Sequence, residues 1–208
     1  MMLCISSYST VMPTYPSESA QTQIEALSLQ IHELKAQLYQ LKRELEPTEV
    51  RDYRFQSADG EVSLSTLFGD RDDLVVIHNM GEQCSYCTAW ADGFSGLAHY
   101  LDDRAAFCVV SPDSPADQAR FAESRGWKFR MVSDPSPSEF TRDLGFWNPD
   151  EGYWPGASGF RRRPDGTLVR VAQAVFGPMD DFCPIWPLFE LLEGGVGDWE
   201  PRYLPPRR

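Results

Sequence analysis

The sequence predicts an α/β domain with a mixed central sheet and helices on both faces, preceded by a long N-terminal amphipathic helix. Three observations predict this architecture. From residue 73 onward, short apolar runs alternate with amphipathic segments, which is typical of parallel strands joined by helices. An Asp165-Gly166 turn signal separates two later strand-like runs and adds an antiparallel hairpin. Ile and Leu repeat at heptad spacing ahead of the domain.

The composition of the chain excludes several classes of function. A net charge of -12 over 208 residues argues against sequence-independent nucleic-acid binding and against a polybasic membrane contact. No apolar stretch approaches the length of a transmembrane helix. The first residues contain neither a basic start nor a long apolar core, so we expect no secretory signal and a cytoplasmic protein.

The chain divides into four segments by composition. Residues 1–20 are rich in Ser, Thr, Pro and Tyr, and we expect them to form a flexible leader. An amphipathic heptad helix is expected over 21–46, and the main domain over 48–195. The Pro/Arg-rich residues 196–208 are expected to trail off as a tail.

The heptad segment has Ile or Leu at its a positions and Leu at its d positions, and Pro47 ends it. Ile at two of the a positions with Leu at every d position favours a parallel dimer. The e and g positions are mostly Gln, Ser and Lys, so charge pairing specifies little. Two interpretations remain open: a homodimer through residues 21–46, or a helix packed on its own domain. The heptad residues are Ile24, Leu27, Ile31, Leu34, Leu38, Leu41 and Leu45.

The main domain begins with a hairpin. Residues 53–69 hold a short strand, an Asp59-Gly60 turn and a second strand that runs into a helical turn. The apolar run at 73–79 is typical of a strand buried on both faces. Apolar residues at helical spacing follow from Cys87 onward.

Turn and cap residues delimit the later elements. Ser114 is expected to cap a helix that Gly126 ends. The other expected elements are a buried strand at 105–113, a strand at 128–134, a short helix at 137–145, a hairpin at 158–173 and a final helix that starts within 182–194.

The chemistry is expected at Cys84 and Cys87, which lie two residues apart in "HNMGEQCSYCTAWADGF". The other cysteines, Cys4, Cys108 and Cys183, are scattered, and an odd, scattered set is not the disulfide framework of a secreted protein. One C-x-x-C pair supplies two thiolates, whereas structural zinc needs four ligands, so we expect no metal. A structural disulfide is disfavoured in a reducing compartment.

A redox role fits the position of this pair between a buried strand and the first turn of a helix. Unpaired N–H groups and the helix dipole stabilise a thiolate there and lower its pKa. We therefore expect Cys84 to be the exposed nucleophile and Cys87 the more buried resolving thiol. No cofactor is required. The expected partners are protein or small-molecule disulfides and a thiol electron donor.

Residues from about 50 to 193 resemble the thioredoxin superfamily. The resemblance lies in "VVIHNM", "CSYCTAWADGFSG", "VVSPDSP", "RGWKFRMVSD" and "PGASGFRRRPDG". The sequence is most similar to a little-characterised bacterial family of dithiol–disulfide oxidoreductases related to the alkyl hydroperoxide reductase/thiol-specific antioxidant group. The resemblance implies a thioredoxin-like fold and thiol–disulfide chemistry.

The resemblance also implies candidate site residues. His78 takes the place of a buried carboxylate that assists proton transfer from the resolving thiol, although a strand histidine satisfied by backbone is the favoured interpretation. The family's cis-proline aligns near Ala157, with Pro155 two residues earlier. Trp154 and Pro155 lie in an aromatic segment that would form a substrate-binding lip beside the cysteines.

A second alignment is open. "C-S-Y-C-T" resembles the T-x-x-C-T of peroxiredoxins, which makes Cys87 the attacking sulfur of a two-cysteine peroxidase. Arg161 would then stabilise the thiolate and the peroxide. A further alternative is a metal-binding or redox-sensing module in which the cysteine pair holds an ion.

Overall fold

The computed structural model describes residues 18–135 and 138–202. The chain divides into two compact units, Met1–Leu45 and Glu46–Arg208. The described part of the first unit is a single long helix, α1 (Glu18–Glu44), which begins before the predicted residue 21. The rest of the predicted leader, residues 1–17, lies outside the described residues.

Helix α1 carries an apolar seam that is exposed among the described residues. None of its residues is buried, and its last turn contains Lys42 and Arg43, which complement the negative end of the helix dipole. The heptad residues are all exposed, from 38% for Ile24 to 63% for Leu34.

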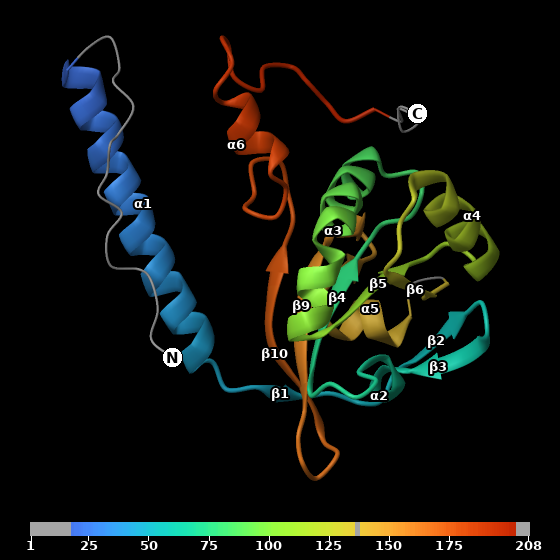
Figure 1. Cartoon of the computed structure of the whole chain (residues 1–208). Coiled ribbons are helices and arrows are strands. Elements are labelled where there is room, and N and C mark those ends of the chain that lie inside the picture. The colour runs from blue at the N-terminus through green and yellow to red at the C-terminus, as the bar shows by residue number, and fades with distance from the viewer. Residues whose placement is uncertain (1–17, 136–137, 203–208) are drawn as a thin grey trace. The chain divides into compact units, whose positions relative to one another are not determined.

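The second unit is built on an eight-stranded mixed sheet, as the sequence predicted (Figure 1). β4, β5 and β6 are parallel, whereas β9 runs antiparallel to β4 and forms a hairpin with β10. In spatial order the strands are β1 (Thr48–Glu49), β10 (Leu168–Val175), β9 (Gly156–Arg162), β4 (Asp73–His78), β5 (Ala106–Ser111), β6 (Arg130–Ser133), β2 (Arg54–Ser57) and β3 (Gly60–Ser63).

Helices cover both faces of this sheet, which confirms the predicted architecture. Side chains of α3 (Ser85–Arg104) and α6 (Ile185–Phe189) pack on one face. Those of α2 (Leu64–Leu67) and α5 (Glu139–Asp143) pack on the other. The remaining helix, α4 (Pro115–Arg125), connects β5 to β6 and has the predicted Ser114 N-cap and left-handed Gly126 C-cap.

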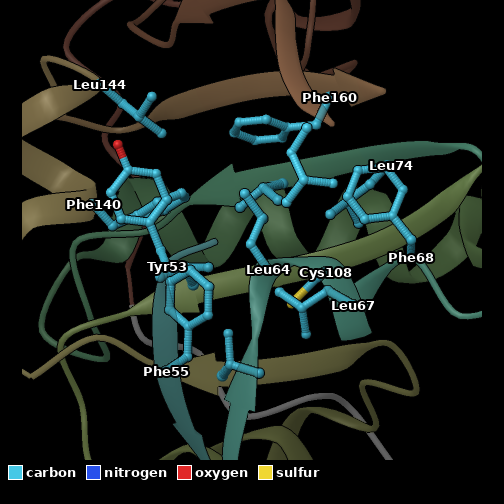
Figure 2. Packing of buried hydrophobic residues seen from close by; sticks show 14 of the residues in the cluster. Tyr53, Phe55, Leu64, Leu67, Phe68, Leu74, Cys108, Phe140, Leu144 and Phe160 are labelled. Atoms are coloured by element: carbon cyan, nitrogen blue, oxygen red, sulfur yellow. The ribbon is translucent and has the colours of Figure 1, made fainter. Parts of the chain in front are cut away.

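The alternation of side chains along β4 divides the interior into two cores. Leu74 and Val76 point into the α2/α5 core, which Figure 2 shows. Ile77 points into the α3/α6 core on the opposite face. Each fully buried Leu or Phe in these cores contributes about 1.5–3 kcal/mol relative to exposure, so both faces anchor the sheet.

Three features differ from the prediction. The aromatic segment for which no strand was predicted contains two short paired strands, β7 (Trp147–Asn148) and β8 (Gly152–Tyr153). The final helix, α6, starts within the predicted 182–194, at Ile185, but ends after five residues. Residues 196–202 do not trail off, because the Trp199 ring packs against Trp186 at 5.9 Å and Phe189 at 4.8 Å between ring centroids.

Within the described part of the chain, no helix combines the length and the apolar character that crossing a membrane requires.

Candidate functional site

The two cysteines lie at the junction between strand β4 and helix α3. Cys84 is the N-cap of α3, and its sulfur accepts a hydrogen bond from the backbone N–H of Cys87 at 3.0 Å. The first N–H groups of a helix lack partners within the helix, so a side chain that accepts from them is stabilised in its anionic form. The fold thus places a sulfur where a helix favours negative charge.

The loop at 79–83 connects the strand to the cysteines, and hydrogen bonds within the loop and to Cys84 fix its conformation. The Asn79 side-chain oxygen accepts from the Gly81 N–H at 2.8 Å, and the Gly81 carbonyl accepts from the Cys84 N–H at 3.1 Å. Gly81 has a φ of 104°, which L side chains rarely adopt. The Met80 N–H, held by this turn, donates to the Cys87 sulfur at 3.4 Å.

The environments of the two thiols are different. Cys84 is half-buried, and a hydrogen bond from the Cys87 side chain, with backbone N–H groups in support, lowers the pKa of Cys84 to about 7. Cys87 is 2% exposed. Its hydrogen bond to Cys84 and its burial both raise the pKa of the Cys87 thiol. At neutral pH the first thiol is therefore partly ionised and the second stays protonated.

Aromatic side chains surround the buried sulfur. Cys87 shares the α3/α6 core with Trp90 and Trp186. Tyr86, between the two cysteines, lies 6.2 Å from Trp90 and 6.1 Å from Trp186 between ring centroids. This packing fixes the first turn of α3.

An open groove runs along α3 from the residue that follows Cys84. The helix contributes Ser85, Thr88, Ala89 and Asp92, which are spaced along one of its faces, and the other lining residues are Arg125, Ile185, Trp199, Pro201 and Arg202. Asp92 pairs with Arg125 and accepts from the Trp127 indole N–H at 2.8 Å. The groove is thus bounded partly by the C-terminal segment that was expected to be a loose tail.

His78 does not approach the cysteines. It points into the α2/α5 core, where its ring stacks on Phe146 at 3.6 Å and its Nε2 lies 2.9 Å from the Ser158 hydroxyl oxygen. Cys87 is in the α3/α6 core on the other face of the sheet. Burial lowers the pKa of His78 to about 3. The suggested proton relay to Cys87 is therefore wrong, because the sheet separates the two side chains.

Arg161 also lies away from the cysteines. Its strand partner across β9 and β4 is Asp73, at the first residue of β4, whereas the cysteines follow the last residue, His78. The guanidinium forms an ion pair with Asp73 at 2.9 Å. Arg161 is therefore at the wrong end of the strand to stabilise a thiolate at Cys84 or Cys87.

Of the three residues proposed for substrate binding, Ala157 and Trp154 lie toward different faces of the sheet. Ala157 pairs with Ile77 and packs against the α3/α6 core, which contains Cys87. Pro155 is buried, and its peptide bonds are trans, as are all those in the described residues. Trp154 is 39% exposed and lines a small cavity with His78 and Tyr153, a cavity whose lining includes neither cysteine.

The comparisons with known proteins place the chain in a family. A family model described as "Bacterial protein of unknown function (DUF899)" matches residues 18–193. The chain belongs to this family. Among curated proteins, none matches this DUF899 chain.

Solved structures show the same fold at low sequence identity. Reduced Prx3 from Vibrio vulnificus is 16% identical with a TM-score of 0.52, over 65% of this chain and 89% of that one. Its complex with hydrogen peroxide gives 18% and 0.50, over 65% and 87%. Peroxiredoxin Q from Xanthomonas campestris gives 20% and 0.50, over 59% and 79%. The DUF899 chain therefore has a thioredoxin-like fold of the kind found in peroxiredoxins.

The structure adds site residues that the sequence reasoning missed. Asn79 and Gly81 shape the loop before the cysteines, and Asp113 accepts from the Glu82 N–H of that loop at 2.9 Å. A sequence signal existed for Asp113, because it is the last residue of the strand predicted at 105–113, and the carboxyl ends of parallel strands meet at one edge. Among the described residues, no three or more His, Cys, Asp or Glu side chains gather as metal ligands.

Proposed function

We propose that this protein is a thiol–disulfide oxidoreductase in which Cys84 is the nucleophile and Cys87 the resolving thiol. The Cys84 thiolate attacks a substrate disulfide, R–S–S–R′, forms a mixed disulfide with R–S, and releases R′–S⁻. Cys87 then gives up its proton and attacks the Cys84 sulfur. The products are R–SH and an intramolecular disulfide, so the substrate is reduced and the protein is oxidised by two electrons.

The asymmetry between the two sulfurs carries this proposal. Cys84 is accessible and has its pKa lowered to about 7, near the ambient pH at which an attacking thiol is most effective. Cys87 is buried, its pKa is raised, and it lies one helical turn away. This arrangement lets the first sulfur meet a substrate while the second waits for the mixed disulfide.

The groove along α3 is the proposed place for the polypeptide or small thiol attached to the attacked sulfur. It begins at Ser85, next to the nucleophile, and contains both apolar and charged side chains. A separate thiol donor would return the protein to the dithiol form. The reducing cytoplasm is the compartment in which we propose that this cycle runs.

A peroxidase that uses Cys87 is the second candidate, and the peroxiredoxin fold of the structural neighbours favours it. In that reaction a Cys87 thiolate would attack a peroxide oxygen, and Cys84 would resolve the sulfenic acid with loss of water. The burial and raised pKa of Cys87 argue against fast attack. So does the position of Arg161, which is paired with Asp73.

The test uses a Cys4→Ser background, so that the thiol at that position does not interfere. The Cys87→Ser and Cys84→Ser variants are treated separately with oxidised glutathione and with hydrogen peroxide, and the adducts are located by mass spectrometry. The proposal predicts a stable glutathione adduct on Cys84 in Cys87→Ser and none in Cys84→Ser. Rapid sulfenic acid formation on Cys87 in Cys84→Ser would instead establish the peroxidase. Thiols that react with neither oxidant would rule out both candidates.

A further inference from the structure

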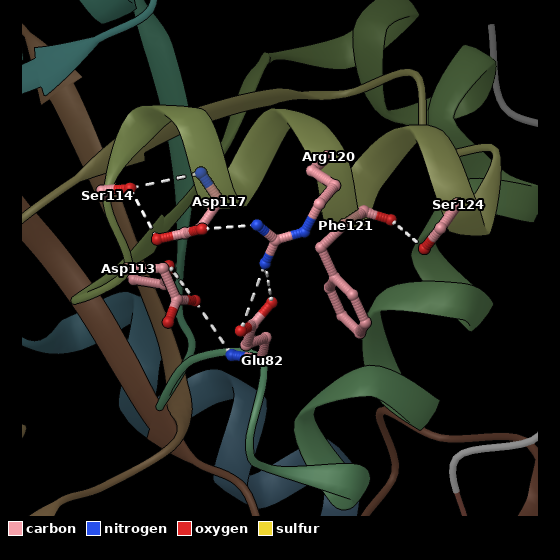
Figure 3. A network of polar contacts seen from close by, with 8 residues as sticks. Glu82, Asp113, Ser114, Asp117, Arg120, Phe121 and Ser124 are labelled. Carbon is pink, nitrogen blue, oxygen red and sulfur yellow. Dashed lines mark hydrogen bonds and ion pairs between the residues drawn. The ribbon is translucent and has the colours of Figure 1, made fainter.

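Asp113 lies beside the loop that leads to the cysteines. It lies two residues after the end of β5 at Ser111, and β5 is the parallel neighbour of β4, with Val110 opposite His78. Both chain segments therefore leave the sheet at the same edge. One carboxylate oxygen of Asp113 accepts from the Glu82 backbone N–H at 2.9 Å (Figure 3). The same oxygen accepts from the Ser111 hydroxyl at 3.0 Å.

The loop backbone rests directly on this carboxylate. A Cβ atom added to Gly81 would lie 2.9 Å from the nearer Asp113 oxygen, so a side chain at this position would force the carboxylate to shift. The positive φ of Gly81 independently disfavours any other residue. The turn at Gly81 is thus held from within by Asn79 and from outside by Asp113.

The same turn delivers two backbone groups to the cysteines. The Gly81 carbonyl accepts from the Cys84 N–H, and the Met80 N–H donates to the Cys87 sulfur. The Met80 hydrogen bond lowers the pKa of Cys87 against the burial that raises it. Among these contacts, only the Met80 bond reaches the resolving sulfur, so its geometry matters when Cys87 becomes a thiolate.

We propose that Asp113 is a positioning residue for the resolving step: it holds the loop so that the Met80 N–H stabilises the Cys87 thiolate as it attacks the mixed disulfide. This inference rests on the proposed oxidoreductase function. In the step concerned, the Cys87 proton is lost to solvent, the Cys87–Cys84 bond forms, and the bond from Cys84 to the substrate sulfur breaks. Asp113 touches neither sulfur and takes no proton in it.

Asp117 provides a matched control within the same polar network. Its carboxylate accepts from Ser114 and pairs with Arg120 at 2.7 Å, and Arg120 also pairs with the Glu82 side chain at 3.1 Å (Figure 3). It therefore has the same charge and the same neighbourhood. Asp113 bonds to the loop backbone, whereas Asp117 is connected to the loop through Arg120 and the Glu82 side chain, so its loss tests electrostatics without removing a backbone bond of the loop.

The experiment follows the reaction of the reduced full chain, in the Cys4→Ser background, with 5,5′-dithiobis(2-nitrobenzoate). The first equivalent of released nitrothiobenzoate reports attack by Cys84, and the second reports resolution by Cys87. We expect Asp113→Ala to slow the second phase about ten-fold, the loss expected for one hydrogen bond to a charged group, and to leave the first phase within about two-fold. Asp117→Ala should leave both phases within about two-fold.

Asp113→Asn keeps a carbonyl oxygen as acceptor and should restore most of the second-phase rate, which also covers the case in which Asp113→Ala fails to fold. A second phase at the parental rate in Asp113→Ala, or equal slowing by Asp117→Ala, would overturn the positioning role. Failure of Asn to restore the rate would do the same. If the parental protein shows no second phase at all, the proposed oxidoreductase function fails instead.

Discussion

The backbone N–H of Cys87 donates to the Cys84 sulfur across 3.0 Å, and this relationship joins the two thiols through the first turn of helix α3. The Cys87 side chain adds a hydrogen bond to the same sulfur, and that bond is the largest contribution to the lowered pKa of Cys84. A nucleophile and its resolving thiol are thus coupled electrostatically before any substrate arrives.

Replacing the side chain of Cys87 should therefore change the titration of Cys84. In Cys87→Ala the donor is lost, so the pKa of Cys84 should rise from about 7 towards about 8.5, the value of a free cysteine. In Cys87→Ser a hydroxyl donor remains and the rise should be smaller. The pH dependence of Cys84 alkylation, followed by mass spectrometry, measures both. Equal midpoints in Cys87→Ala and the parent would show that the helix N–H groups alone set the pKa.

Protonation of His78 should destabilise the fold in acid. Burial lowers its folded-state pKa to about 3, while the unfolded value is about 6.5, so the unfolded state binds an extra proton between these pH values. The free energy of unfolding should thus fall as the pH drops through this window, by up to about 1.4 kcal/mol per pH unit. Above about pH 6.5, His78 is neutral in both the folded and the unfolded state, so it no longer reduces the free energy of unfolding.

His78→Phe isolates this contribution, since it keeps a ring for stacking on Phe146 but cannot titrate. Urea unfolding of both proteins between about pH 7 and about pH 5 should show a shallower decline in the variant. Identical slopes would contradict a neutral, buried His78.

Loss of Arg161 should leave the thiol chemistry intact. Arg161→Ala removes a partly exposed ion pair to Asp73, which also pairs with Arg104. We expect a loss of at most about 1 kcal/mol in the free energy of unfolding and unchanged alkylation of Cys84. A marked fall in the reactivity of either cysteine would mean that Arg161 does approach the site. Arg161 could then stabilise the thiolate and the peroxide, as the peroxidase alternative requires.

We also propose that the seam of α1 pairs with the α1 of a second copy. In a parallel dimer the Lys35 and Lys42 e positions face Gln residues, whereas an antiparallel pair would bring lysines together. Leu34→Glu, at a d position of the seam, should therefore convert a dimer into a monomer in sedimentation. Leu29→Glu changes an equally exposed leucine on the opposite side of the helix and should not. A monomeric parent would reject the dimer.

The sequence predicted the elements whose signals are local. The buried strand β4, the helix that begins at the C-x-x-C pair and the Ser114 and Gly126 caps of α4 all occur where expected. Each depends on a few neighbouring residues: an apolar run, a helical repeat, a capping hydroxyl or a residue that tolerates positive φ. The lowered pKa of Cys84 also follows from the place of this residue at a helix N-terminus.

The wrong predictions concerned side chains whose neighbours depend on strand register or on distant segments of the chain. His78 is adjacent in sequence to the cysteine loop, but the alternation of β4 turns it to the opposite face from Ile77. The composition predicts a loose tail over residues 196–208, but Trp199 packs against Trp186 and Phe189. Such contacts depend on distant segments, which no local pattern specifies.

By itself, the sequence determined a mixed α/β fold and a cysteine pair at a strand–helix junction, because hydrogen bonding and apolar periodicity within short windows are sufficient to specify them. Only the tertiary structure decided which residues attend that pair. The antiparallel register of β9 on β4 sends Arg161 to Asp73, and the parallel pairing of β4 with β5 brings Asp113 to the loop at Gly81. Register is set by the packing of whole faces against each other, so it becomes visible only when the chain has folded.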